Sequence, residues 1–303
     1  IFRLLAQDLA GLQTIESLSD HLTELADTIV QETLPLCWGT IRKRHCAAPK
    51  FAVIGYGKLG GKELGYVSDL DLVYLYDDAD PDAEENYARL GQRLNTWLSS
   101  QTSAGILFET DLRLRPNGDA GLLAVSVDAF RDYQLKSAWP WEHQALTRAR
   151  FCAGDPAVGA RFEQIRCEIL CQQRDLAKLK EEVIAMRQKM IDAHASKSAT
   201  EFDLKQDPGG IIDVEFIVQF LVLGHAHRYQ QLTGNLGNIA LLRIAGELGL
   251  IPAAEAAAAG DAYREYRRLQ HAQRLSANPR HLTGRESIEK HIAAVNTLWQ
   301  AVF

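Results

Sequence analysis

The sequence predicts an α+β protein whose first domain, with a mixed β-sheet, is preceded by helices and followed by a helical bundle domain. Two observations predict this class. Short strand-type runs, separated by glycine turns and acidic stretches, occur between residues 51 and 115, whereas from residue 155 onward apolar residues recur almost throughout at helical spacing. The expected domains are therefore residues 1–155 and 156–303, with the boundary near Gly154 and Pro156.

The predicted helices lie on both sides of the strand region. Residues 1 to about 35 show apolar residues at helical spacing, which predicts two amphipathic helices with Ser19 and Asp20 as candidate caps between them. Another helical pattern follows the first strands. The predicted helices after residue 80 are 87–100, 183–194, 210–223, 238–248, 253–260, 262–274 and 288–299.

The stretch Phe51–Asp78 is predicted to form strand, glycine turn, short helical connection and strand. Its first strand-type run ends at Gly55, and the second, Leu70–Tyr76, is β-branched and aromatic, as buried strands are. Asp69 and Asp71 stand two residues apart at the start of the second run. Because side chains alternate along a strand, both carboxylates are expected on one face.

A further strand is predicted at Ile106–Arg115, where polar and apolar residues alternate from Phe108 onward. One face would carry Asp111, Arg113 and Arg115. Such alternation is also typical of an ordinary solvated sheet face, and by itself the pattern supports both interpretations equally. The carboxylate and the two cations together favour a site.

Composition and charge limit the class of protein. The chain has 303 residues, of which 47% are hydrophobic, and a formal net charge of −6, so a protein or small-molecule partner is favoured over nucleic acid. The five cysteines include no CxxC pair, which indicates a reduced, cytoplasmic protein. The apolar run Ile211–Gly224 is shorter than the ~20 residues that span a bilayer, so no membrane partner is expected. The start at Ile1 and the end at Phe303 suggest a fragment of a longer chain.

Paired carboxylates near a turn of bare backbone amides are typical of metal-assisted phosphoryl or nucleotidyl chemistry. Asp69, Asp71 and Asp111 are therefore the candidate catalytic residues and ligands of one or two Mg²⁺ ions, with a nucleotide triphosphate as substrate. Basic side chains and small residues near these carboxylates would contact the nucleotide phosphates. The candidate nucleotide-binding residues are Lys58, Gly60, Gly61, Ser68, Arg113 and Arg115.

Two other interpretations of these motifs are weaker. A dinucleotide-binding turn at Gly55-Tyr-Gly57-Lys-Leu-Gly60 is disfavoured because the crossover to the next strand is very short and that strand starts with paired acids. A Walker A motif is absent from the sequence.

The order of Gly60-Gly61, Asp69-Leu-Asp71 and a later strand with Asp111 resembles the polymerase-β-like nucleotidyltransferase superfamily.

The resemblance extends to a particular family within that superfamily. GYGKLGGKELGYVSDLDLVYLYDD, FETDLRLRPNGDAGLL, YQLKSAWPWEHQALTRAR and FDLKQDPGGIIDVEFIVQ are similar to segments of the bifunctional glutamine synthetase adenylyltransferase/adenylyl-removing enzymes. In that family one half attaches AMP to a tyrosine of glutamine synthetase and the other removes it by phosphorolysis. Tyr56, Leu70 and Lys205-Gln-Asp207 resemble the adenylylating, C-terminal half.

The resemblance implies roles for individual residues. Asp69 and Asp71 match the metal-binding DxD of the family, Asp111 its third carboxylate, and Gly60-Gly61 its phosphate-side turn. The last of the four similar segments offers candidate secondary site residues, although residues two apart on a helix cannot face one site together. These secondary candidates are Lys205, Asp213 and Glu215.

The resemblance also implies partners: glutamine synthetase as substrate, the PII signal protein, and glutamine as effector. It leaves two alternatives open besides AMP transfer to glutamine synthetase. One is phosphorolytic removal of AMP, and the other is a non-catalytic regulatory module of the same enzyme.

Several other residues are predicted to be structural. Trp139 and Trp141 are expected to serve in packing rather than in stacking on a nucleotide, and the neighbouring His143 keeps a smaller chance of a role on the substrate side. The two histidines at 225 and 227 are expected to be solvated or to cap a helix, and the cysteines at 167 and 171 to lie in the core.

Overall fold

A computed structural model describes residues 2–196, 198–276 and 282–303. The chain forms two compact units, residues 1–169 and 170–303. The expected fold class is confirmed: the first unit has a mixed five-stranded sheet with helices, and the second is mostly helical. The units divide after Ile169, so α7 (Pro156–Leu170) packs almost wholly with the first. The domain boundary near residue 155 stays a prediction.

The sheet of the first unit has the order β3-β2-β1-β5, and β4 also pairs with β2. The central strands β1 and β2 are antiparallel, as are β1 and β5, whereas β3 and β4 run parallel to β2 at its two ends. The strands are β1 (Phe51–Gly55), β2 (Leu70–Tyr76), β3 (Thr110–Asp111), β4 (Ala124–Ser126) and β5 (Arg150–Gly154). The two predicted strands β1 and β2 are thus confirmed.

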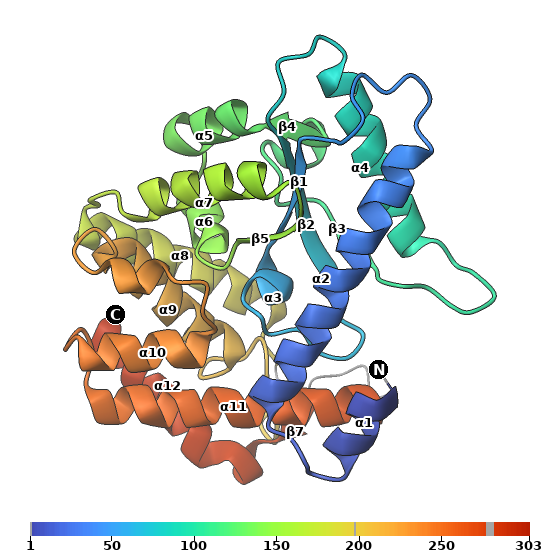
Figure 1. Ribbon diagram of the computed structural model, residues 1–303. Helices are drawn as coiled ribbons and strands as arrows, with labels where there is room; N and C mark the ends of the chain where they lie inside the picture. Colours follow the sequence, from blue (N-terminus) through green and yellow to red (C-terminus); the bar gives the residue numbers. More distant parts are fainter. Residues whose placement is uncertain (1, 197, 277–281) are drawn as a thin grey trace. The chain divides into compact units, whose positions relative to one another are not determined.

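Helices cover both faces of this sheet. In Figure 1, α2 and α4 lie over one face and α5 and α7 over the other. The helices of this unit are α1 (Phe2–Leu9), α2 (Ile15–Gly39), α3 (Gly57–Gly60), α4 (Ala83–Ser99), α5 (Val127–Lys136), α6 (Pro140–Leu146) and α7, with a 3-10 turn, η1, at Gly118–Ala120. Because both faces are covered, almost every residue of β1 and β2 is buried.

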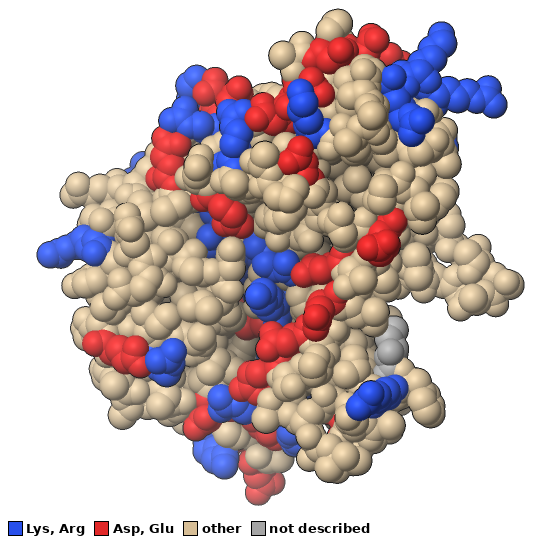
Figure 2. Space-filling model, in the orientation of Figure 1, with Lys and Arg blue, Asp and Glu red and all other residues tan. Residues whose placement is uncertain are grey.

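The longest helix of the unit, α2, is amphipathic along its length. Its apolar stripe includes Leu18, Leu22 and Leu34, which are buried in the same core as Val53 of β1 and Tyr74 of β2. Acidic residues follow its solvent-facing side, which Figure 2 shows as a diagonal of red atoms. The apolar area removed from water, at ~25 cal/mol per Å², is what holds α2 on the sheet.

The start of α2 differs from the prediction. Thr14 is the N-cap, since its Oγ1 accepts a hydrogen bond from the Ser17 backbone N–H at 3.2 Å. Ser19 and Asp20, the expected caps, lie inside the helix, so that prediction was wrong. The turn between α1 and α2 instead lies near Gly11, whose φ of +67° is in the left-handed region that favours glycine.

The expected strand Ile106–Arg115 is also wrong in extent, because only Thr110–Asp111 forms β3. The Asp111 carboxylate accepts a hydrogen bond from the Arg113 backbone N–H at 2.9 Å. The Arg115 N–H bonds to the Leu112 carbonyl at 3.4 Å. An aspartate that bonds to the backbone two residues on turns the chain, and strand alternation therefore does not continue past Asp111.

The second unit is a set of helices with one small two-stranded sheet. Its elements are α8 (Leu176–His194), β6 (Glu201–Asp203), α9 (Ile211–His225), η2 (Gln230–Thr233), α10 (Asn238–Glu247), α11 (Ala253–Leu275), β7 (Leu282–Gly284), η3 (Arg285–Ile288) and α12 (Glu289–Val302). The two helices expected at 253–260 and 262–274 are one continuous helix, α11. The β6–β7 pair was not predicted.

The apolar helix α9 is buried on nearly all sides, as predicted for Ile211–Gly224. Its Asp213 pairs with Arg187 of α8, and both side chains are almost completely inaccessible to solvent. A buried charge is tolerated where an opposite charge and hydrogen bonds satisfy it. Among the described residues, no helix combines the length and apolarity that a bilayer crossing requires.

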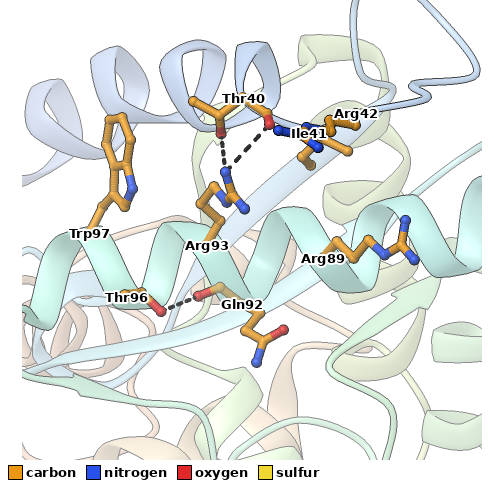
Figure 3. Close-up of a pocket in the computed structure, with 8 residues that line it drawn as sticks. All are labelled: Thr40, Ile41, Arg42, Arg89, Gln92, Arg93, Thr96 and Trp97. Atoms are coloured by element: carbon orange, nitrogen blue, oxygen red, sulfur yellow. Dashed lines mark hydrogen bonds between the residues drawn. The ribbon is translucent and has the colours of Figure 1, made fainter.

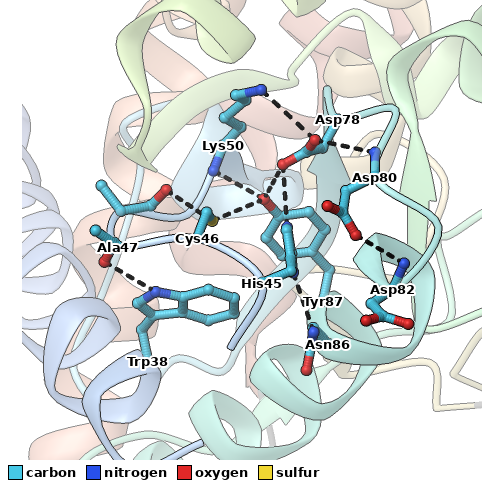
Figure 4. A network of polar contacts seen from close by, with 11 residues as sticks. Trp38, His45, Cys46, Ala47, Lys50, Asp78, Asp80, Asp82, Asn86 and Tyr87 are labelled. Atoms are coloured by element: carbon cyan, nitrogen blue, oxygen red, sulfur yellow. Dashed lines mark hydrogen bonds and ion pairs between the residues drawn. The ribbon is translucent and has the colours of Figure 1, made fainter. Parts of the chain in front are cut away.

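A buried polar network fastens the end of β2 to the connection before β1 and to α4 (Figure 4). Asp78 accepts a hydrogen bond from the Tyr87 hydroxyl at 2.9 Å and lies 3.1 Å from His45 Nε2. Asn86 contacts the other ring nitrogen of His45 at 3.0 Å. Burial by itself raises the pKa of Asp78, but the contacts with His45 and Tyr87 outweigh it and lower the pKa to about 2.

Candidate active site

Sheet register brings the three predicted carboxylates together. Asp69 immediately precedes β2, and Asp71 is the second residue of that strand. The short strand β3 runs parallel beside β2, and its Asp111 is the register partner of Asp71. As a result, carboxylate oxygens of Asp69, Asp71 and Asp111 all lie within 4.8 Å of one another. This is the convergence that the sequence predicted.

The cluster carries an excess of negative charge. Burial, followed by repulsion from Asp69 and Asp111, raises the pKa of Asp71 to about 6, although Arg148 and Lys58 act in the opposite direction. Hydrogen bonding from Arg113 instead lowers the pKa of Asp111. Three converging carboxylates supply only oxygen donors, the type that Mg²⁺ prefers. These residues therefore fit a hard divalent cation, which would relieve the repulsion.

The glycine turn packs directly against this cluster. The Tyr56 N–H donates to the Asp71 carbonyl at 2.9 Å, and Gly57 has a φ of +53°. A Cβ on Gly57 would lie 2.1 Å from Asp71 Oδ2, and one on Gly60 would lie 1.8 Å from the Arg148 carbonyl oxygen. The left-handed φ favours glycine at position 57, and at position 60 any side chain would overlap the backbone just before β5.

The predicted phosphate-contacting residues have different surroundings. Arg113 is largely exposed and donates from Nε to both oxygens of Asp111 at 3.0 and 2.9 Å. Arg115 is mostly buried. Its Nη1 donates to the Leu112 carbonyl at 2.7 Å, and this bond holds the 112–121 loop. The Ser68 hydroxyl accepts from the Gly65 N–H at 3.1 Å. Lys58 lies in α3, where its charge acts on Asp71.

An open pocket of about 560 Å³ adjoins the carboxylates. Its lining combines acidic and basic side chains, including Asp69, Asp111, Arg113 and Arg115. Asn95 of α4 lines it too, and it hydrogen-bonds the Thr110 hydroxyl in β3. A pocket of this size can hold a nucleotide, with carboxylates and arginine side chains both available to contact it.

Comparisons with known proteins identify the family of the chain. Residues 1–165 match the family described as glutamate-ammonia ligase adenylyltransferase, and residues 177–282 match the family described as GlnD PII-uridylyltransferase. The first match covers more than half of the chain. The chain belongs to the glutamate-ammonia ligase adenylyltransferase family.

Similar proteins carry the description "bifunctional glutamine synthetase adenylyltransferase/adenylyl-removing enzyme". The chain is 64% identical over 303 residues to the one from Aromatoleum aromaticum, covering 100% of this chain and 32% of that protein. It is 62% identical over 279 residues to the one from Nitrosomonas europaea, covering 92% and 30%. It is 56% identical over 302 residues to the one from Chromobacterium violaceum, covering 100% and 33%. The chain thus spans about a third of the length of these relatives.

One ion pair beside the site of this adenylyltransferase-family chain was not predicted from the sequence. Arg148 Nη2 lies 2.7 Å from Glu63 Oε2, and both side chains are buried. The Arg148 guanidinium also borders Gly61, where an added Cβ would lie 2.8 Å from its Nε. A signal was present in the sequence, since Arg148 belongs to the YQLKSAWPWEHQALTRAR segment that carries the family resemblance.

Trp139 and Trp141, which were expected to serve in packing, are exposed rather than packed in the core. Their side chains are 65% and 42% exposed. Trp139 precedes α6, where its backbone N–H donates to Glu142 Oε2 at 2.8 Å. The neighbouring His143 is buried, and its Nε2 lies 2.9 Å from the Gln134 carbonyl oxygen. The sequence pattern indicated a helix here but did not reveal which of these side chains face solvent.

The secondary candidates lie in the second unit, and the structure does not bring them to one point there. Asp213 is held by Arg187 and also accepts from the Gly209 N–H at 2.6 Å. Glu215 contacts the Tyr263 hydroxyl at 3.4 Å. The Lys205 backbone N–H donates to Asp203 at 2.8 Å. These contacts stabilise the turn before α9 and the start of that helix.

The remaining structural predictions concern partly buried residues. Cys167 and Cys171, expected in the core, are only half-buried. His225 and His227 at the end of α9 are likewise half-buried rather than solvated, and burial lowers the pKa of His225.

Proposed function

We propose that this chain transfers AMP from ATP to a tyrosine hydroxyl of glutamine synthetase, releases pyrophosphate, and depends on Mg²⁺. The observation that carries the proposal is the convergence of Asp69, Asp71 and Asp111 within 4.8 Å, beside a glycine turn, in a chain of this family. A protein adenylyltransferase needs such a cluster because the triphosphate and the attacking hydroxyl must both be brought to one phosphorus atom.

Each residue has a part in the proposed reaction. Asp69, Asp71 and Asp111 would hold Mg²⁺, which when bound neutralises phosphate charge and lowers the pKa of the attacking hydroxyl. The exposed Arg113 is free at its outer edge to contact phosphate oxygens while it orients Asp111. A bond forms between the tyrosine oxygen and the α-phosphorus, and the bond to the pyrophosphate oxygen breaks. Asp111, on the nucleophile side, accepts the tyrosine proton.

The direction of AMP transfer is part of the proposal. The printed name of the similar proteins includes both addition and removal of AMP, so phosphorolytic removal is the second candidate. Addition is favoured because Tyr56, Leu70 and Lys205-Gln-Asp207 resemble the adenylylating half of the family.

Regulation by PII and by glutamine is proposed on the family resemblance alone. A non-catalytic regulatory module is the third candidate. The complete set of three carboxylates counts against it, because a chain without catalytic function has no need to keep mutually repelling acids together.

The test uses variants that keep side-chain volume but remove ligand charge. Asp69→Asn and Asp71→Asn are each expected to lower AMP transfer at least about 100-fold, because metal coordination contributes several kcal/mol to such reactions. The assay follows α-labelled ATP incorporated into unmodified glutamine synthetase. Asp119→Asn is the control: this acid lines the same pocket but is exposed and outside the carboxylate cluster.

Retained transfer in both Asn variants would refute the assignment of these carboxylates. A parallel assay with adenylylated glutamine synthetase and phosphate decides the direction. Release of ADP there, without incorporation in the first assay, would identify the removing activity instead.

A further inference from the structure

A second, larger hollow lies on the first unit, apart from the carboxylate cluster. Its volume is about 800 Å³, and it lies between α4 and the residues that end α2 (Figure 3). We call it the arginine groove, defined by Thr40, Ile41, Arg42, Arg89, Gln92, Arg93, Thr96 and Trp97. It shares no lining residue with the pocket beside the carboxylates, among the residues that the structure describes.

Helix α4 separates the two pockets. Arg89, Arg93 and Trp97 are spaced four residues apart, so they form one stripe along the helix, which Figure 3 shows facing the end of α2. Asn95 lines the carboxylate pocket instead. Residues two apart on a helix point about 200° from each other, so Arg93 and Trp97 point away from the side of α4 that carries Asn95.

The lining of the groove is strongly cationic. Arg89 and Arg93 come from α4, and Arg42 comes from the chain that follows α2. None of the described lining residues is acidic, although the whole chain has a net charge of −6. Arg89 has a partner in Glu85, one turn away on the exposed side of the helix, and such exposed pairs contribute little energy.

One guanidinium is held in place within the groove. Arg93 Nη1 donates to Thr40 Oγ1 at 2.7 Å and to the Thr40 carbonyl at 3.4 Å. These bonds use one nitrogen and leave the donors of the other two nitrogens available to a ligand. In the part of the chain that the structure describes, Arg42 has no hydrogen-bond or ion-pair partner.

The arginines are not required to cap α2. The Cys37 and Trp38 carbonyls at its end already accept hydrogen bonds from the Thr40 and Ile41 N–H groups, each at 3.1 Å. The Thr40 hydroxyl also donates to the Cys37 carbonyl at 2.7 Å. Since these groups satisfy the helix end, helix capping does not account for three arginines in one groove.

We propose that the arginine groove binds a nucleotide, at a site distinct from the catalytic carboxylates. Arginine forks match phosphate oxygens in pairs. Trp97 is 42% exposed at one end of the groove and offers a ring face on which a planar base stacks. A volume of about 800 Å³ holds a mononucleotide. Binding there needs no metal, because the positive charge is supplied by the protein.

The test is a titration of the protein with ADP in excess EDTA, followed by calorimetry. Without a divalent cation, the three carboxylates repel phosphate, so binding reports on the groove. Wild type is expected to bind one ADP. The double variant Arg89→Ala/Arg93→Ala is expected to raise the Kd for ADP about 100-fold, which is about tenfold for each charge-assisted hydrogen bond that it removes. Asp69→Asn/Asp71→Asn should leave Kd within about threefold of wild type in EDTA.

A charge-matched control distinguishes the site from general attraction. Arg243→Ala/Arg264→Ala removes two exposed helical arginines that each have an acidic partner one turn away, as Arg89 has. This variant should bind ADP as wild type does. The proposal is overturned if wild type does not bind ADP in EDTA, if the control variant weakens binding equally, or if the Arg89→Ala/Arg93→Ala variant binds normally.

Inorganic phosphate and Trp97→Leu test whether the base is recognised. Trp97→Leu should weaken ADP binding about tenfold and leave phosphate binding unchanged, because stacking contributes ~1–3 kcal/mol per base, a factor of about 5–150. Equal affinity of wild type for phosphate and ADP would contradict a nucleotide site. Circular dichroism of each variant excludes loss of fold as the cause.

Discussion

Asp78 shows how one buried carboxylate contributes pH-dependent stability. Its folded-state pKa, about 2, lies below the ~3.9 of an unfolded aspartate. A lowered folded pKa means that the stabilisation is fully present above about pH 4 and is lost as the pH falls toward 2. A difference of about two pKa units corresponds to about 2–3 kcal/mol.

Asp78→Asn is therefore expected to lower the free energy of unfolding by about 2–3 kcal/mol at pH 7, with a gap to wild type that narrows between pH 4 and pH 2. Urea denaturation at several pH values measures this gap. Asp20→Asn, at an exposed position of α2, serves as the control and should show no such trend. A gap that is the same at pH 7 and pH 2.5 would contradict the role of the Asp78 charge.

Gly60 is a second residue whose environment sets a clear expectation. A Cβ there would lie 1.8 Å from the Arg148 carbonyl oxygen and 2.5 Å from that of Gly55, and backbone atoms cannot move aside as a flexible side chain can. Gly60→Ala should lower the free energy of unfolding by about 2–3 kcal/mol or more. Gly39→Ala, where a Cβ meets nothing within 4 Å, should be neutral or slightly stabilising. Thermal denaturation of the two variants compares them.

Residue identity predicted the convergence of the three carboxylates better than it predicted the residues around them. Asp69 and Asp71 could be assigned to one face because strand alternation is local. The approach of Asp111 to these two residues required only that its strand lie beside theirs, and β3 does pair with β2. The segment with the family resemblance pointed to Arg148, but its pairing with Glu63 could not be predicted, since the two residues are far apart in sequence and meet only in the folded chain.

At the scale of elements, helix α2 offers a comparison within one helix. Leu34 is 3% exposed in the core beneath α2, whereas Leu36, two residues on, is 60% exposed. Leu34→Ala should lower the free energy of unfolding by about 2–5 kcal/mol, because it removes buried methyl groups and leaves a cavity. Leu36→Ala should change it by less than about 0.5 kcal/mol. Equal effects in chemical denaturation would show that α2 does not use the apolar stripe described here.

Periodicity predicted the elements with a long, regular pattern and failed for short ones. Strands β1 and β2 and most helices followed from spacing alone. The expected strand at 106–115 ended early because the Asp111 side chain accepts a hydrogen bond from the backbone of Arg113. The alternation of polar and apolar residues does not predict such a local bond. Strands β6 and β7 escaped prediction because each has three residues and pairs with a segment distant in sequence.

At the scale of the whole molecule, each of the two units contains a buried ion pair of its own. The first unit has Arg148–Glu63 beside the carboxylates, and the second has Arg187–Asp213 between α8 and α9. Both members of the second pair are buried, so removing one leaves a charge that water cannot reach. Breaking such a pair costs about 3–5 kcal/mol.

Asp213→Ala is therefore expected to destabilise the second unit by about 3–5 kcal/mol while the carboxylate cluster of the first unit keeps its affinity for a divalent cation. Differential scanning calorimetry measures the loss of stability, and Mn²⁺ titration at a temperature below the first transition measures the affinity. Asp261→Ala, on an exposed face of α11, is the control for the loss of one acidic charge. If Asp213 is instead a ligand of the catalytic metal, Mn²⁺ affinity falls together with stability. The cation titration therefore separates a structural role of Asp213 from the secondary site role that its sequence context suggested.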